Sequence, residues 1–191
     1  MTSVAGHHVE DAVAEMLAVL TPHDEVDWRV LAGGLDWDCW ETAAHVAHDL
    51  LAYAGQVAAH ATDGYLPFGL VIAPEASPHQ VLQIVQACGR LLSDAVTNAS
   101  SGPVAWHWGI SDASGFAAMG TAETLVHTYD ITQGLGVAWL PPDSLSQLVV
   151  ARLLPDAPPG PPTEILLSAT GRTDLEGEPH VREWVWRAAP R

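Results

Sequence analysis

The segment that most constrains the fold is residues 113–134, where apolar side chains appear nearly all the way round a helical wheel. These apolar residues are Met119, Ala122, Leu125, Val126, Tyr129 and Ile131. A helix with this pattern is largely buried, so the rest of the chain must surround it. One polar stripe interrupts the pattern: Glu123, His127 and Asp130, at positions i, i+4 and i+7.

Three further segments show the apolar spacing of helices, at residues 6–20, 39–61 and 77–99. The last of these opens with Ser77 and Pro78, a helix N-cap followed by proline at the first helical position. Four long helices joined by moderate connections predict a mainly α protein with a four-helix bundle, in which sites are built between facing helices.

The pattern changes after residue 137. A short helix is expected up to about residue 154, followed by five prolines within residues 155–162. Residues 164–170 and 181–187 then form two short runs, the second alternating as a half-buried strand does. We therefore predict a bundle domain at residues 1–137 and a C-terminal extension at residues 138–191, made of a helix, a proline-rich linker and a β-hairpin.

Charge and composition narrow the expected partners. The 191 residues include seven arginines, no lysine and 23 acidic residues, for a formal net charge of −16. Such a chain repels phosphate groups, so neither nucleic acid nor an anionic membrane is expected as a partner. No apolar run approaches the roughly 20 residues that cross a bilayer. We expect a cytoplasmic protein that acts on a small-molecule substrate. A homodimer formed through the helices is also consistent with this composition.

The two cysteines, Cys39 and Cys88, lie far apart and form no CxxC motif. We expect both cysteines to be buried in the core as small hydrophobic residues. Any thiol chemistry would then use a thiol supplied from outside the chain.

The polar stripe of residues 113–134 suggests metal binding. A Glu and a His four residues apart on a helix project about 40° apart, so Glu123 and His127 can reach one ion. A histidine from a second helix would complete a set with an open fourth position, as in catalytic zinc sites. His45 and His48 are both candidates. The alternatives are a solvated helix face, or a buried histidine satisfied by its Glu partner.

Two motifs resemble those of the DinB-like metal enzymes, most closely the N-terminal domain of mycothiol-dependent maleylpyruvate isomerases. The first is Leu35-Asp-Trp-Asp-Cys-Trp-Glu-Thr-Ala-Ala-His45, and the second is Gly120-Thr-Ala-Glu-Thr-Leu-Val-His-Thr-Tyr-Asp130. The resemblance covers roughly residues 7–137.

The resemblance implies a bundle that binds zinc, or another divalent ion, through Glu123, His127 and one histidine of the second helix. The family places that histidine eight residues after a tryptophan, a spacing that fits both His45 and His48. Glu41 stands where the family often has an acid, which favours His45 and leaves His48 as the alternative. Asp130 is expected either to orient His127 from behind or to lie on the surface.

The family's chemistry implies a metal-bound low-molecular-weight thiol such as mycothiol, and hence a transferase or isomerase acting on a small electrophile. The family's fuller C-terminal domain helps to bind carboxylates; here Arg172, Arg182 and Arg187 are the candidate anion-binding residues. A non-catalytic metal or small-ligand binding module is the alternative, with His48, His107 or Asp130 closing the site. A metal-dependent hydrolase ranks last because Asp49 is a poor candidate for its base.

Overall fold

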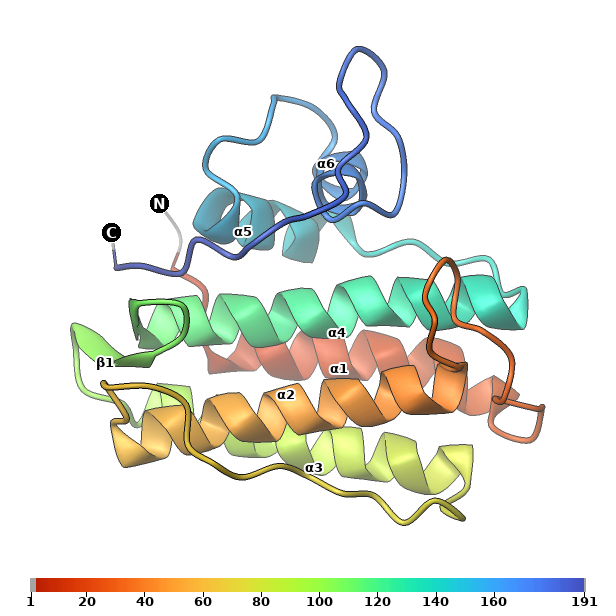
Figure 1. Cartoon of the computed structure of the whole chain (residues 1–191), viewed down its shortest axis with the longest axis horizontal. Helices are drawn as coiled ribbons and strands as arrows, with labels where there is room; N and C mark the ends of the chain where they lie inside the picture. Colours follow the sequence, from red (N-terminus) through yellow and green to blue (C-terminus); the bar gives the residue numbers. More distant parts are fainter. Residues whose placement is uncertain (1–2, 191) are drawn as a thin grey trace.

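The computed structural model describes residues 3–190 and is mainly α-helical, as predicted. The long helices are α1 (Gly6–Leu20), α2 (Cys39–Ala59), α3 (Pro78–Thr97) and α4 (Ala113–Leu135). They lie side by side as a bundle, with α5 (Asp143–Leu153) and α6 (Pro162–Ala169) packed above α4 (Figure 1). A 3-10 turn, Thr21–His23, follows α1. Among the described residues, no helix has both the length and the apolar character needed to cross a membrane.

Local signals explain where the helices begin and end. The Asp38 carboxylate accepts the Glu41 N–H at 2.7 Å, and the Glu41 carboxylate accepts the Asp38 N–H at 3.0 Å. This capping box starts α2, so Glu41 has a structural role there. Ser77 and Gln80 form the same reciprocal pair at the start of α3. Gly136, with φ of 69°, ends α4 in the left-handed conformation that glycine adopts without strain.

The extensive burial predicted for the fourth helix is confirmed. α4 contacts all three other helices of the bundle as well as α5. Its buried residues run almost without interruption from Gly115 to Thr132. Glu123 and His127 are therefore carried by a helix that has no extended solvent face.

The predicted β-hairpin at the C-terminus is wrong in its location. Residues 164–169 belong to α6, and residues 181–187 follow an extended path that pairs with no strand. The hairpin lies instead before α4, where β1 (Pro103–Trp106) pairs antiparallel with β2 (Ile110–Asp112). The alternation of residues 181–187 arises because Trp186 points into the protein while Val185 and Arg187 are exposed.

The C-terminal segment crosses the bundle as a strap, residues 181–188, between α4 and the α5–α6 pair (Figure 1). Arg152 of α5 donates hydrogen bonds to the backbone oxygens of Arg187 and Ala188, at 3.3 and 2.9 Å. Ser111 donates a further bond to the Ala188 oxygen at 2.6 Å. These contacts hold the strap against the bundle without any strand pairing.

Candidate metal centre

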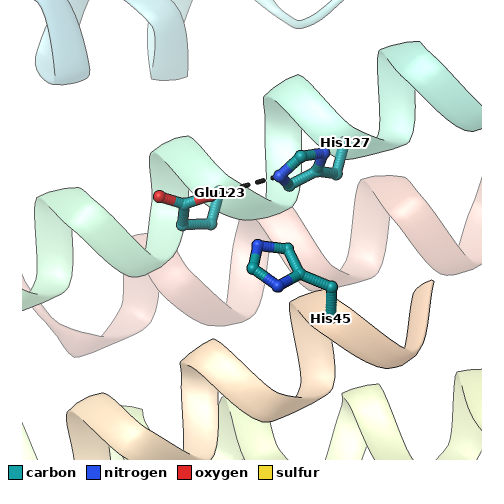
Figure 2. A group of neighbouring side chains, drawn as sticks. All are labelled: His45, Glu123 and His127. Carbon is teal, nitrogen blue, oxygen red and sulfur yellow. Dashed lines mark ion pairs between the residues drawn. The ribbon is translucent and has the colours of Figure 1, made fainter. Parts of the chain in front are cut away.

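Three side chains converge between α2 and α4: His45 from α2, and Glu123 and His127 from α4 (Figure 2). One ligand atom from each lies within 4.8 Å of the other two. Glu123 Oε2 is 3.4 Å from His127 Nε2, and the two imidazoles meet edge to face with their centres 5.0 Å apart. Among residues 3–190, this is the one cluster of three such donors.

Burial rules out a solvated face for this part of α4. Glu123 and His127 are each only 6% exposed. A buried carboxylate and imidazole need partners, because an unpaired charge costs several kcal/mol in an apolar interior. Each has a second partner on the side away from the cluster, which leaves the facing atoms directed toward His45.

Asp130 is the second partner of His127. Its Oδ2 lies 2.9 Å from His127 Nδ1, so Nε2 is the nitrogen that faces Glu123. Arg172 holds Asp130 in turn, donating from Nε at 3.2 Å and from Nη2 at 2.8 Å. Burial acts to raise the pKa of Asp130, but the hydrogen bonds from His127 and Arg172 outweigh it and hold that pKa below its usual value. Asp130 therefore lies behind His127, buried, and not on the surface.

Trp186 is the second partner of Glu123, and sequence reasoning missed it. The indole N–H donates to Glu123 Oε1 at 2.7 Å, which leaves Oε2 facing His127. Burial acts to raise the pKa of Glu123, while the hydrogen bonds from His127 and Trp186 lower it overall. No pattern in the sequence links Trp186 to Glu123, because the two residues meet only through the path of the strap.

The same partners act on His127. Burial acts to lower the pKa of His127, but hydrogen bonds to Asp130 and Glu123 raise it to about 9. In the chain without metal, a proton on this imidazole is stabilised between two carboxylates. A metal ion on Nε2 would take the place of that proton, which is how metal binding and protonation compete at histidine ligands.

His48 lies outside the cluster, and His45 lies in it. His48 Nδ1 is 3.1 Å from Asp49 Oδ1, and the His48 side chain is 38% exposed. Asp49 Oδ2 is 3.4 Å from His45 Nε2. His45, Asp49 and Tyr53, at positions i, i+4 and i+8 of α2, form a polar stripe that faces α4.

Asp49 is closer to the cluster than the sequence suggested. Burial raises its pKa, and the charge of Glu123 adds to the shift. Burial also lowers the pKa of His45 and favours its neutral form, the one that binds a metal. Asp49 thus borders the cluster on the side of α2.

The arginines predicted to bind anions have different surroundings. Arg172 is committed to Asp130 and to the Thr170 backbone oxygen. Arg187 pairs with Asp156 at 2.6 Å on the surface. Arg182 lines a polar cleft of about 590 Å³ together with Arg172 and His180. Anion binding by Arg182 or Arg187 stays a prediction.

Both cysteines are buried and free, as the sequence analysis expected. Burial raises the pKa of Cys39 to about 11, and burial likewise raises that of Cys88. The Cys39 thiol donates to the Ile131 backbone oxygen at 3.7 Å. Neither thiol is part of the cluster, and neither has the lowered pKa of a reactive cysteine.

The donor set fits a zinc ion. Two ligands on tetrahedral zinc, each about 2.0–2.1 Å from the metal, lie about 3.3 Å apart. The 3.4 Å separation of Glu123 Oε2 and His127 Nε2 is close to that value. Two imidazoles and one carboxylate are also the donors found in catalytic zinc sites with an open position. The Glu123–His127 pair therefore has the spacing of two zinc ligands, and His45 lies within 4.8 Å of both.

A scan against protein-family models finds no matching family, and searches of curated proteins and of solved structures find no match either. The support for a metal centre therefore comes from the geometry of His45, Glu123 and His127.

Proposed function

We propose that this chain is a metal-dependent enzyme in which His45, Glu123 and His127 bind zinc or a similar divalent ion. The observation that carries the proposal is the convergence of these three donors, with no fourth His, Cys, Asp or Glu of the described chain completing the group. An open position of this kind admits a small molecule. The motif resemblance supports the finer assignment, a thiol-utilising transferase or isomerase of the mycothiol type that acts on a small electrophile.

In this proposal, the residues around the cluster have distinct roles. Asp130 and Trp186 orient His127 and Glu123 from behind, and the Arg172 ion pair fixes Asp130. A bound divalent ion supplies Lewis acidity and lowers the pKa of a thiol or water that binds to it. Asp49, whose Oδ2 lies 3.4 Å from His45 Nε2, would be the residue placed to accept a proton there. Cys39 and Cys88 take no part, so the thiol comes from a separate molecule.

The position of Asp49 also supports a second candidate function, a metal-dependent hydrolase. Such an enzyme needs a general base within reach of a metal-bound water. Asp49 Oδ2, 3.4 Å from His45 Nε2, stands at the edge of the cluster where such a base belongs. A non-catalytic binding module is less well supported. The residues that would close its site are engaged elsewhere: His48 with Asp49, His107 with Tyr65, and Asp130 with Arg172.

The first experiment measures the metal content of the purified, untagged chain by elemental mass spectrometry. We expect about one zinc per chain in the parent. His45→Ala and His127→Ala should lose it, because each removes one of three ligands. His48→Ala is the matched control on the same helix and should keep its metal. A parent chain that takes up no stoichiometric metal when zinc is offered would contradict the proposal.

Cobalt substitution then separates the two candidate reactions. Adding a small thiol to the cobalt-loaded chain should produce a thiolate-to-cobalt charge-transfer band in the near ultraviolet. A chain that binds cobalt but gives no such band with thiols would favour the hydrolase.

A further inference from the structure

A cavity of about 250 Å³ opens beside the metal cluster. Its walls come from α2, from the loop that follows α2 and from the turn of the β1–β2 hairpin. Asp49 and Tyr53 line it and also border the cluster: Asp49 lies against His45, and Glu123 is close enough to add to the raised pKa of the buried Tyr53 phenol. The cavity therefore adjoins the donor cluster through Asp49, which lines the cavity and contacts His45.

The walls of the cavity are fixed by hydrogen bonds. Gln56 donates to the backbone oxygens of Gly64 and Trp106, at 3.0 and 2.8 Å, and accepts the Leu66 N–H at 2.8 Å. One side chain of α2 therefore holds both the following loop and the hairpin. The loop runs back along α2 and α3 in Figure 1. The cavity is formed in the free chain, as ligand pockets usually are.

Aromatic rings dominate the lining. Tyr53, Tyr65, Phe68 and His107 all contribute to it, and Tyr53 meets His107 edge to face with ring centres 5.2 Å apart. An engineered cavity of about 150 Å³ is enough to bind benzene. A cavity of about 250 Å³ therefore accepts a molecule with one ring and a short substituent.

No positive side chain is available to a ligand carboxylate in this cavity. The chain has no lysine, and none of the arginines within residues 3–190 lines the cavity. Burial lowers the pKa of His107 to about 4, so its imidazole is neutral near pH 7. His48 sits at the rim and is already paired with Asp49. The one acidic residue that lines the cavity, Asp49, offers a carboxylate no counter-charge.

We infer that this cavity is a binding site for an uncharged or cationic one-ring molecule, and that it rejects carboxylates. Aromatic faces attract cations. The assignment of this molecule as the substrate rests on the proposed metal function. Arg172, Arg182 and His180 line a separate cleft, so the positive charge of this region lies outside the cavity.

The test uses three probes that share one ring: benzylamine, benzyl alcohol and benzoate. Their binding to the full chain is measured by ligand-observed NMR titration near pH 7, after a chelator has removed metal. Metal is removed because amines and carboxylates also bind zinc directly. We expect benzylamine and benzyl alcohol to bind at least tenfold more tightly than benzoate. Benzoate binding as tightly as the amine would overturn the inference.

Two variants locate the binding. Ala52 lines the cavity, and Ala52→Phe should fill it and abolish binding of both favoured probes. Ala58→Phe, on the exposed side of the same helix, is the matched control and should bind as the parent does. Probe binding that survives Ala52→Phe would overturn the inference.

The outcome is separable from that of the metal experiment. A chain that binds no metal but shows the expected probe order would keep the cavity assignment and lose the proposed enzyme. A chain that binds zinc but none of the probes would keep the metal centre and lose the cavity assignment.

Discussion

At the scale of single residues, two of the proposed metal ligands are held by partners behind them. His127 is hydrogen-bonded to Asp130, and Glu123 accepts a hydrogen bond from the indole N–H of Trp186. Such partners fix the orientation of a ligand and tune its basicity, and their loss typically lowers metal affinity about 10- to 100-fold. Trp186 is of special interest because it reaches Glu123 from a segment outside the bundle helices.

Replacing Trp186 by Phe tests this role. Trp186→Phe keeps an aromatic ring but removes the N–H that orients Glu123, so we expect zinc affinity to fall about 10- to 100-fold. Affinity is measured by competition with a chromophoric chelator. Trp184→Phe is the control: Trp184 packs against Trp186, with ring centres 4.3 Å apart, and it makes no hydrogen bond to Glu123. Equal affinities in both folded variants would show that the indole N–H does not matter.

At the scale of elements, α4 depends on close packing with its neighbours. Gly120 lies where a Cβ atom would collide with the Leu92 side chain of α3 and stand 3.2 Å from Leu50 Cδ2 of α2. The helix can approach both neighbours there because the side chain is missing. Gly120 is about one turn before Glu123, so the same close packing also fixes the position of Glu123 and His127 relative to α2.

Gly120→Ala is therefore expected to destabilise the protein. Alanine improves helix propensity by about 1 kcal/mol. Overpacking a tight core typically costs about 1–3 kcal/mol. We expect the second effect to win, lowering the free energy of unfolding measured by urea titration of the metal-free chain. A gain in stability would mean that α3 can move away from α4 at no cost.

The helices show how far the sequence alone could lead. Helix α1 was predicted with its observed bounds, and α2, α3 and α4 within about two residues at each end, because caps such as Asp38 and Ser77 and the apolar spacing act locally. The choice between His45 and His48 was not local. It depends on how α2 is rotated relative to α4, which the alanines between the two faces left undefined in the sequence.

At the scale of the whole molecule, the strap is the part for which the sequence-based prediction was wrong. Residues 181–187 alternate as a strand does, yet their partners are Arg152 side-chain nitrogens, the Leu153 backbone oxygen and the Glu123 carboxylate. Alternation reports which side chains are buried but does not say what covers them. The Trp186–Glu123 contact and the location of the hairpin both required the three-dimensional arrangement.

The stability of the whole fold should also depend on pH through His107. Burial lowers the pKa of His107 from 6.5 to about 4. Between these two values the unfolded chain binds a proton at this imidazole and the folded chain does not. Stability from this residue is thus fully present above pH 6.5 and is lost as the pH falls toward 4, where the loss reaches about 3 kcal/mol.

His107→Phe tests this linkage. The free energy of unfolding of the variant should fall less than that of the parent between pH 7 and pH 4.5, in urea titrations of metal-free protein. His60→Asn, which removes an exposed imidazole, serves as the control and should follow the parent. Parallel curves for the parent and His107→Phe would show that the imidazole is protonated in the folded chain.

The strap has a consequence for the order in which the site is assembled during synthesis. Chains emerge from the ribosome N-terminus first, and the earlier segments begin to fold before the later ones exist. A nascent chain that has reached the end of α4 already carries His45, Glu123 and His127 but not yet Arg172 or Trp186. The ligands are therefore made before the groups that hold them in place. A metal ion bound at the proposed site at that stage would gain the support of Trp186 only after the strap has packed against Glu123.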